Sequence, residues 1–185
     1  MRSQGAILIL ALIFCSRGAL AAPPDAQAIR KALEAEYAKR ATVLQKRDLP
    51  AFAATMTTDF IWESSMGVVR KGKAAYLDLV KLEMDNFKPV YQPHSVTFHI
   101  DDMHVHGDRV AVMVTQHDAL QRRDKQGQTH KMDAFAVYQE LWRKTGPGWK
   151  FAGMKEVRGM LTRDGKVVNR WQAEPGAPHA LTPSP

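Results

Sequence analysis

Apolar residues in the first half of the chain recur with the period of an α-helix. After Asp25, a favourable N-cap residue, they follow steps of three and four residues up to a helix end near Asp48. The residues on this apolar face are Ile29, Leu33, Tyr37, Ala41 and Leu44. The same reasoning predicts a second, short helix over residues 49–56, capped by Asp48, and a third over about 73–87. A short strand over 60–62 lies between them.

Beyond Pro89 apolar and polar residues alternate, which is typical of strands with one buried face. Turn residues at Gly107–Asp108, Asp124–Gly127 and Gly146–Gly148 divide this half into strands. The predicted strands cover about 95–100, 110–120, 132–143 and 149–157. Helices followed by an antiparallel meander predict an α+β fold, in which a curved sheet wraps around helices packed on one face.

The first 21 residues predict a cleaved secretory signal peptide. Arg2 gives a positive start, residues 6–15 form an apolar run, and Ala19–Ala21 forms an A-x-A cleavage site. The run is much shorter than the roughly 20 residues that cross a bilayer as a helix. We therefore expect a periplasmic or secreted protein that is cleaved before Ala22 and is free of the membrane afterwards.

The signal peptide also carries the one cysteine of the chain, Cys15. A lipoprotein anchored through this cysteine is the alternative, but bulky Phe14 stands where lipidation signals have a small residue. Cleavage leaves a chain without cysteine, so its stability rests on an apolar core and not on disulfides. We expect one domain over residues 22–165 and a proline-rich, disordered tail over 166–185.

Charge and motifs exclude several classes of function. The net charge of +7 is scattered, without a basic stripe interleaved with aromatic residues, so we expect no nucleic-acid partner. The chain has no G-x-S-x-G motif and no glycine-rich phosphate loop, which argues against nucleophilic catalysis and a cofactor. His104 and His106 would share one strand face, but no third ligand has a suitable spacing, and we expect no metal.

Several short segments, in their order and spacing, resemble the NTF2-like superfamily, in particular its SnoaL-like and DUF4440 members. The segments are 46–49, 57–62, 70–74, 105–111, 140–143 and 148–150. The resemblance covers roughly residues 26–158 and implies a cystatin-like cone with an apolar pocket between sheet and helices. It also implies a homodimer, which this fold often forms. Because the fold hosts isomerases, dehydratases and binding proteins alike, the resemblance does not fix the function.

Ketosteroid isomerase, a member type with the same layout, uses a carboxylate base, a tyrosine and a protonated carboxylic acid. Counting along the chain, these positions fall on Ser64, Arg40 and Glu140. Glu140 alone carries the required group, so the resemblance does not imply steroid isomerisation.

Glu140 is the candidate catalytic residue. It shares a predicted strand face with apolar residues, which would disfavour its charge and poise it as an acid. The alternative is that Glu140 lies near the strand end and pairs with Arg143 or Lys155. The candidate pocket residues are Tyr37, Trp62, Gln116, Asp118, Tyr138 and Trp142.

The residues that face the pocket depend on strand register. If the second hairpin is centred on residue 126, Asp118 lies opposite Ala134 and on the face of Glu140. A slip of one residue would invert every assignment. Glu63 is expected to point to the opposite face of its strand from Trp62, into solvent.

Three functions stay open. The leading hypothesis is a protein that binds a small, largely apolar molecule in its cone. The first alternative is an acid–base enzyme of isomerase, dehydratase or hydrolase type that uses Glu140. The second is a homodimeric interaction module that uses an exposed sheet face.

Overall fold

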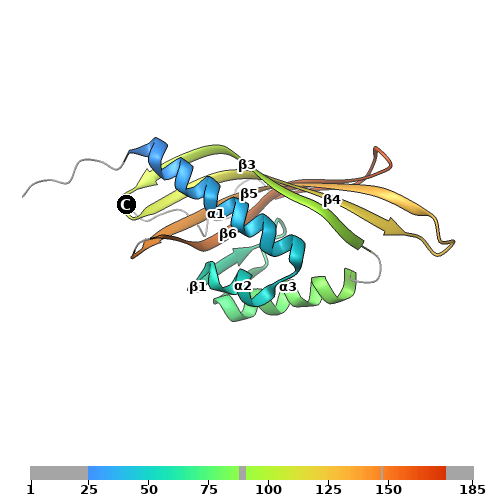
Figure 1. Cartoon of the computed structure of the whole chain (residues 1–185), viewed down its shortest axis with the longest axis horizontal. Coiled ribbons are helices and arrows are strands. Elements are labelled where there is room, and N and C mark those ends of the chain that lie inside the picture. Colours follow the sequence, from blue (N-terminus) through green and yellow to red (C-terminus); the bar gives the residue numbers. More distant parts are fainter. Residues whose placement is uncertain (1–24, 88–90, 147, 174–185) are drawn as a thin grey trace, which may run out of the picture.

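The computed structural model describes residues 25–87, 91–146 and 148–173, which form three helices and a seven-stranded sheet (Figure 1). The helices are α1 (Ala26–Lys46), α2 (Leu49–Ala54) and α3 (Lys73–Phe87). The strands are β1 (Met56–Glu63), β2 (Val69–Lys71), β3 (Tyr91–His106), β4 (Arg109–Arg123), β5 (Thr129–Thr145), β6 (Gly148–Arg163) and β7 (Lys166–Gln172). The signal peptide predicted over residues 1–21 lies outside the described residues.

The helix boundaries follow from local capping. The Asp25 side chain accepts a hydrogen bond from the Gln27 amide at 2.9 Å, which satisfies a free N–H of the first turn of α1. Arg47 ends α1 in the left-handed region, with φ of 55°. The next residue, Asp48, accepts from the Ala51 amide at 3.0 Å and caps α2. The predicted first and third helices are confirmed, and α2 is two residues shorter than expected.

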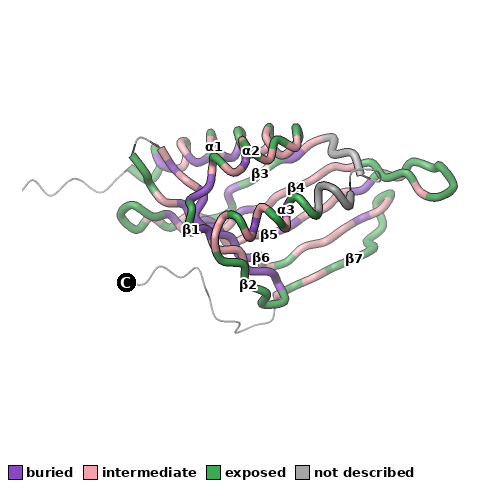
Figure 2. The backbone as a smooth tube through the Cα atoms, turned by 90° about the horizontal axis from the view of Figure 1, so that it is seen from below, coloured by how far each residue is buried: buried purple, intermediate pink, exposed green. Residues whose placement is uncertain are grey.

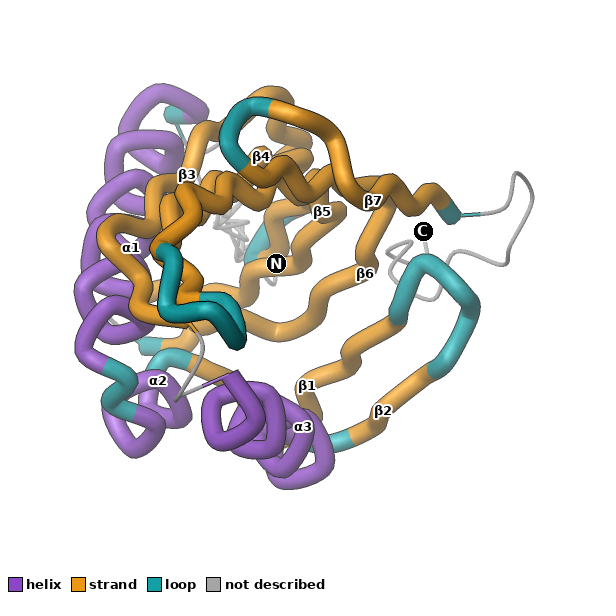
Figure 3. The backbone as a smooth tube through the Cα atoms, turned by 90° about the vertical axis from the view of Figure 1, so that its right-hand side faces the viewer, coloured by secondary structure: helices purple, strands orange, loops and turns teal. Residues whose placement is uncertain are grey.

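The sheet is mixed and not purely antiparallel. Its strand order is β2-β1-β6-β5-β4-β3, with β7 also paired to β6. Strands β3 to β6 form the predicted antiparallel meander, whereas β1 lies parallel to β6. Seen end-on, the sheet bends strongly, with α1 beside β3 and α3 beside β1 (Figure 3). The predicted α+β fold is confirmed.

The predicted tail boundary at residue 166 is wrong. Residues 166–172 form β7, which follows a tight turn at Asp164–Gly165 and pairs antiparallel with β6. Most β7 side chains are exposed, so the strand lacks the buried alternation by which strands are recognised in a sequence. The rest of the predicted tail, residues 174–185, lies outside the described residues.

The predicted register of the second hairpin is confirmed, since Asp118 pairs with Ala134. Even-numbered residues of β4 and β5 therefore point to the inner face of the sheet, toward the helices. The fully buried part of this face contains Val110, Val112, Val114, Glu140 and Trp142. Buried positions gather near the meeting of β1 and β6, whereas the hairpin ends are more exposed (Figure 2). Within the described residues, no helix is long and apolar enough to cross a membrane.

Candidate functional site

A buried ion pair joins α1 to the inner face of the sheet. The Arg40 guanidinium donates to both oxygens of Glu140, with Nη1 3.0 Å from Oε2 and Nη2 2.7 Å from Oε1. The side chains are 3% and 0% exposed. The guanidinium carbon also lies 4.4 Å from the ring centroids of Phe98 and Phe151. Because removing two charges from water is costly, such a pair persists only when its hydrogen bonds and geometry are good.

Two aromatic side chains complete the surroundings of Glu140. The Tyr37 hydroxyl donates to Glu140 Oε2 at 2.8 Å, and the Trp142 indole N–H lies 3.2 Å from the same oxygen. Burial, and then the charge of Glu140, raise the pKa of Tyr37 well above its usual value. Burial acts to lower the pKa of Arg40, but the charge and hydrogen bonds of Glu140 outweigh it and raise that pKa. Both oxygens of Glu140 are thus occupied by fixed donors.

The expectation that Glu140 pairs with Arg143 or Lys155 is wrong. Arg143 binds Asp59 at 2.9 Å, and Lys155 binds Glu63 at 2.8 Å. Glu63 is also not in solvent, because its side chain is 4% exposed. The physical reason is the parallel pairing of β1 with β6, which places Glu63 in register with Lys155. The catalytic role predicted for Glu140 stays a prediction.

A second polar group lies farther along the inner face, where the side chains are half-buried. The Gln116 amide donates to both oxygens of Asp118, at 3.1 and 2.8 Å. The residues opposite them on β5 are small, because Gln116 pairs with Ala136 and Asp118 with Ala134. We call these two alanines the floor. Among the described residues Asp118 makes no ion pair. Burial raises the pKa of Asp118, against the opposing effects of Gln116 and nearby positive charge.

Tyr138 stands next to this group, opposite Val114 on the inner face. Burial raises the pKa of its phenol well above the usual value, and the nearby acidic groups of Tyr76, Glu156 and Asp118 raise it further. Five elements therefore bring ionisable groups together: α1, α3, β4, β5 and β6. We call Gln116, Asp118 and Tyr138, with the floor of Ala134 and Ala136, the open region.

The candidate pocket residues thus fall into two clusters. Tyr37 and Trp142 surround Glu140, whereas Gln116, Asp118 and Tyr138 form the open region. Trp62 is in neither cluster, but it stacks on Tyr76 of α3, which lies near Tyr138, with ring centroids 6.1 Å apart.

The sequence reasoning did not include Tyr76 and Glu156 in the site, and it named Arg40 only as the residue at the tyrosine position of ketosteroid isomerase. For Arg40 a signal was present, because it follows Tyr37 by three residues and so lies on the apolar face of α1. For Glu156 the signal was absent, because its place depends on the bulged pairing of β5 with β6.

The sequence model of the SnoaL-like domain family matches residues 37–170. The chain belongs to this family. Three solved structures give the same fold at low identity. A conserved protein from Planctomyces limnophilus is 12% identical, with a TM-score of 0.57 over 74% of this chain and 98% of that one. A putative scytalone dehydratase from Novosphingobium aromaticivorans is 14% identical, with a TM-score of 0.57 over 83% and 97%.

An NTF2-like protein with a cystatin-like fold, also from Novosphingobium aromaticivorans, is 15% identical, with a TM-score of 0.52 over 70% and 81%. At these identities the likeness establishes the NTF2-like, cystatin-like fold and not the function. A search of the curated proteins finds no match.

This SnoaL-like domain also has a groove between α1 and the edge strand β3. Its volume is about 380 Å³, and Tyr37 is the member of the predicted set that lines it. Other lining residues are Arg30, Ala38 and Ala41 from the helix and Thr97, Phe98 and His99 from the strand. The groove lies at the rim of the sheet, and its lining residue Phe98 pairs with Gln116 of the open region.

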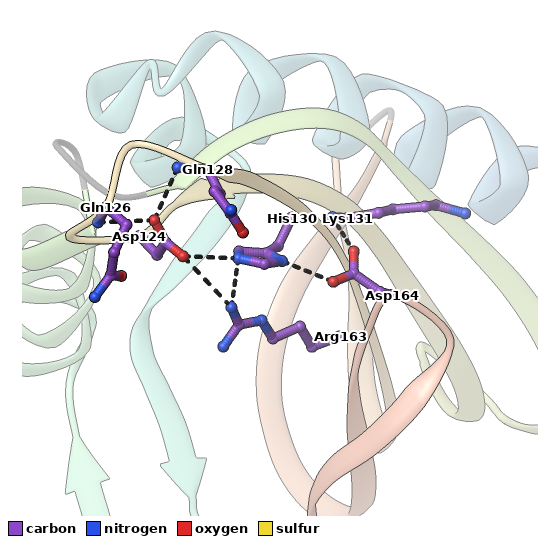
Figure 4. Close-up of polar contacts among 7 residues, drawn as sticks. All are labelled: Asp124, Gln126, Gln128, His130, Lys131, Arg163 and Asp164. Atoms are coloured by element: carbon purple, nitrogen blue, oxygen red, sulfur yellow. Dashed lines mark hydrogen bonds and ion pairs between the residues drawn. The ribbon is translucent and has the colours of Figure 1, made fainter.

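At the ends of the hairpins, His130 lies between two carboxylates (Figure 4). Its Nδ1 is 2.7 Å from Asp164 and its Nε2 is 3.0 Å from Asp124, and Arg163 contacts the same ring nitrogen as Asp124. Hydrogen bonds to Asp124 and then Asp164 raise the pKa of His130, which in turn lowers the pKa of both carboxyls. The cluster ties the β4–β5 turn to the β6–β7 turn. In the described part of the chain, no group of three His, Cys, Asp or Glu side chains could hold a metal.

Proposed function

We propose that this chain is an exported protein that binds a small, largely apolar molecule at the open region. One observation carries the proposal: Asp118 is a half-buried carboxyl on an apolar inner face, with an amide neighbour and without an ion-pair partner among the described residues. Such a group lowers the stability of the folded protein unless a ligand or a reaction needs it. Ligand sites typically combine apolar walls with a few polar groups of this kind.

The chemistry of the open region favours a neutral ligand with one hydrogen-bonding group. Gln116 and Tyr138 each offer a donor and an acceptor, and Asp118 offers lone pairs when ionised or a donor when protonated. Ala134, half-buried, and Ala136, buried, present only methyl groups beside these polar side chains. A ligand carbonyl or hydroxyl would therefore bind at this polar group, with its apolar part over Ala134 and Ala136.

The test uses prodan, a neutral naphthalene ketone whose fluorescence shifts in an apolar site. Filling the floor with Ala134→Phe should weaken prodan binding roughly tenfold, equivalent to about 1.4 kcal/mol. Ala119→Phe is the matched control, because Ala119 is a half-buried alanine of β4 on the outer face, beside Asp133. Equal affinities in both variants would contradict the proposal.

Export is the second part of the proposal, and it rests on the n-region, apolar run and A-x-A site of residues 1–21. Expression of the full chain in a bacterium should release a protein that begins at Ala22. Native mass spectrometry of the released protein measures the processed mass, the oligomeric state and any co-purified ligand together. An intact N-terminus in the cytosolic fraction would contradict export.

An acid–base enzyme is the second candidate function. The raised pKa of Asp118 favours it, because a carboxyl poised closer to neutral pH can exchange protons with a bound substrate. On this hypothesis Asp118 and not Glu140 moves the proton, since fixed donors occupy both oxygens of Glu140. The relative named as a putative scytalone dehydratase makes dehydration a reasonable first reaction to assay. Turnover that survives Asp118→Asn would exclude this role.

A homodimer formed through the outer sheet face is also part of our proposal. The outward positions of β4, β5 and β6 are rich in half-buried apolar side chains. They include Met113, Phe135, Val137, Leu141 and Met160. Uncovered apolar patches of this kind mark interaction surfaces. Leu141→Lys should then convert a dimer to a monomer in light scattering, and a wild-type monomer would contradict the proposal.

A further inference from the structure

One row of paired residues crosses the inner face from β3 to β7. Phe98 pairs with Gln116, Gln116 with Ala136, Ala136 with Gly159, and Gly159 with Trp171. Directly opposite residues of antiparallel strands project from the same face. The row therefore places aromatic residues at both ends and Gln116, Ala136 and Gly159 in the middle, beside Asp118 and Tyr138.

Gly159 makes room for the Trp171 ring. A Cβ atom at position 159 would lie 2.1 Å from the indole, a distance that real side chains do not reach. Any larger residue at this position would displace the ring. The indole of Trp171 thus lies over the backbone of β6 on the inner face, and its half-buried state leaves part of its surface accessible.

A carboxylate fixes the orientation of the ring. The Trp171 indole N–H donates to Glu156 Oε1 at 2.6 Å, and the other oxygen of Glu156 accepts from the Ser65 amide at 3.2 Å. Glu156 pairs with Tyr138 across β5 and β6, so the fixed indole is close to the open region. The Ala173 amide, which donates to the Val157 carbonyl at 2.7 Å, holds the end of β7 in place.

Trp171 lies directly after the residues that the SnoaL-like family model matches. The family match ends at residue 170, one residue before the indole. The ring stands on the face where the proposed ligand binds.

We propose that Trp171 forms the β6–β7 wall of the ligand site and sets the size of the ring system that the site accepts. This inference rests on the proposed function. Phe98 forms the opposite end of the row, with Gln116, Ala136 and Gly159 between. The ligand class that follows from this proposal is a flat, neutral molecule of about two fused rings. A polar group on that molecule reaches Asp118 and Tyr138.

The experiment compares prodan with anthradan, its anthracene analogue, which carries the same polar groups and one more fused ring. The measured quantity is the ratio of the two dissociation constants. Wild type should prefer prodan, and Trp171→Ala should shift the ratio about tenfold toward anthradan. Val168→Ala is the control on the same strand, because Val168 is 52% exposed, and its ratio should equal that of wild type.

Gly159→Ala tests the same inference without removing the indole. Its new Cβ displaces the ring, so it should shift the ratio in the same direction as Trp171→Ala. Circular dichroism checks that each variant folds. If Trp171→Ala does not fold, Trp171→Phe, which keeps a smaller ring, takes its place with a smaller shift in the same direction.

One result would overturn the role of Trp171, and a different result would overturn the proposed function. If wild type binds prodan but folded Trp171 and Gly159 variants keep its ratio, the role of Trp171 is refuted and the proposed function survives. If wild type binds neither probe, the proposed function fails at its first step.

Discussion

Replacing Glu140 with glutamine tests whether the buried pair holds the fold or takes part in chemistry. The variant keeps the size of the side chain and an acceptor for Tyr37 and Trp142. It leaves the Arg40 charge buried without its counterion, in a position where the side chain is 3% exposed. Breaking a buried pair in this way costs about 3 to 5 kcal/mol of unfolding free energy.

That loss is large for a domain of this size, whose total stability is of the order of 5 to 15 kcal/mol. With a urea m-value of about 2 kcal/mol/M, the unfolding midpoint falls by roughly 1.5 to 2.5 M. The assay is urea unfolding at pH 7, followed by far-UV circular dichroism. Glu34→Gln is the matched control, because Glu34 pairs with Arg30 on the exposed side of α1 and should change stability by less than about 1 kcal/mol.

A double variant separates the lost charge from lost packing. Arg40→Met combined with Glu140→Gln removes both charges and keeps an acceptor for Tyr37 and Trp142. We expect it to recover most of the stability that Glu140→Gln loses, since neutral replacements of buried pairs are often tolerated. A loss below about 1 kcal/mol in Glu140→Gln would refute this reasoning, since no buried charge would then depend on Glu140.

Three further predictions use the same unfolding assay. The stability difference between wild type and His130→Ala should be larger at pH 5 than at pH 8. The reason is the raised pKa of His130: its contribution to the free energy of unfolding is complete below the unfolded-state pKa of 6.5 and is lost as the pH rises through the folded-state pKa. The aspartate partners of His130 have lowered pKa values, so their contribution to stability is lost only in acid. An equal stability difference at both pH values would contradict the proposed interaction of His130 with these carboxylates. Asp118→Asn should stabilise the protein at pH 7 and not at pH 3, since a raised pKa makes the ionised carboxyl unfavourable in the folded state; destabilisation at pH 7 would argue for a structural role. Glu63→Gln should cost about 3 to 5 kcal/mol, whereas a solvent-exposed Glu63 would give a change within about 0.5 kcal/mol.

The parts of the fold that depend on local sequence were predictable. The boundaries of α3 and the pairing of Asp118 with Ala134 follow from helical spacing and from a turn centred on residue 126. The pairing of β1 with β6 was not predictable, because it joins segments about ninety residues apart and leaves no periodic signal. The expected solvent exposure of Glu63 failed for that reason. Strand β7 escaped notice because its side chains are mostly exposed.

The two polar clusters of the inner face place opposite demands on the protein. Around Glu140 each carboxylate oxygen has a donor, so the charge there is compensated and the cluster links α1 rigidly to the sheet. At Asp118 an amide is the one hydrogen-bonding partner among the described side chains, and burial works against the charge. A ligand that hydrogen-bonds to Asp118 removes this free-energy penalty when it binds. Part of its binding free energy therefore comes from the removal of that penalty. Asp118→Asn should therefore raise stability and weaken ligand binding together, whereas substitutions around Glu140 should lower stability first.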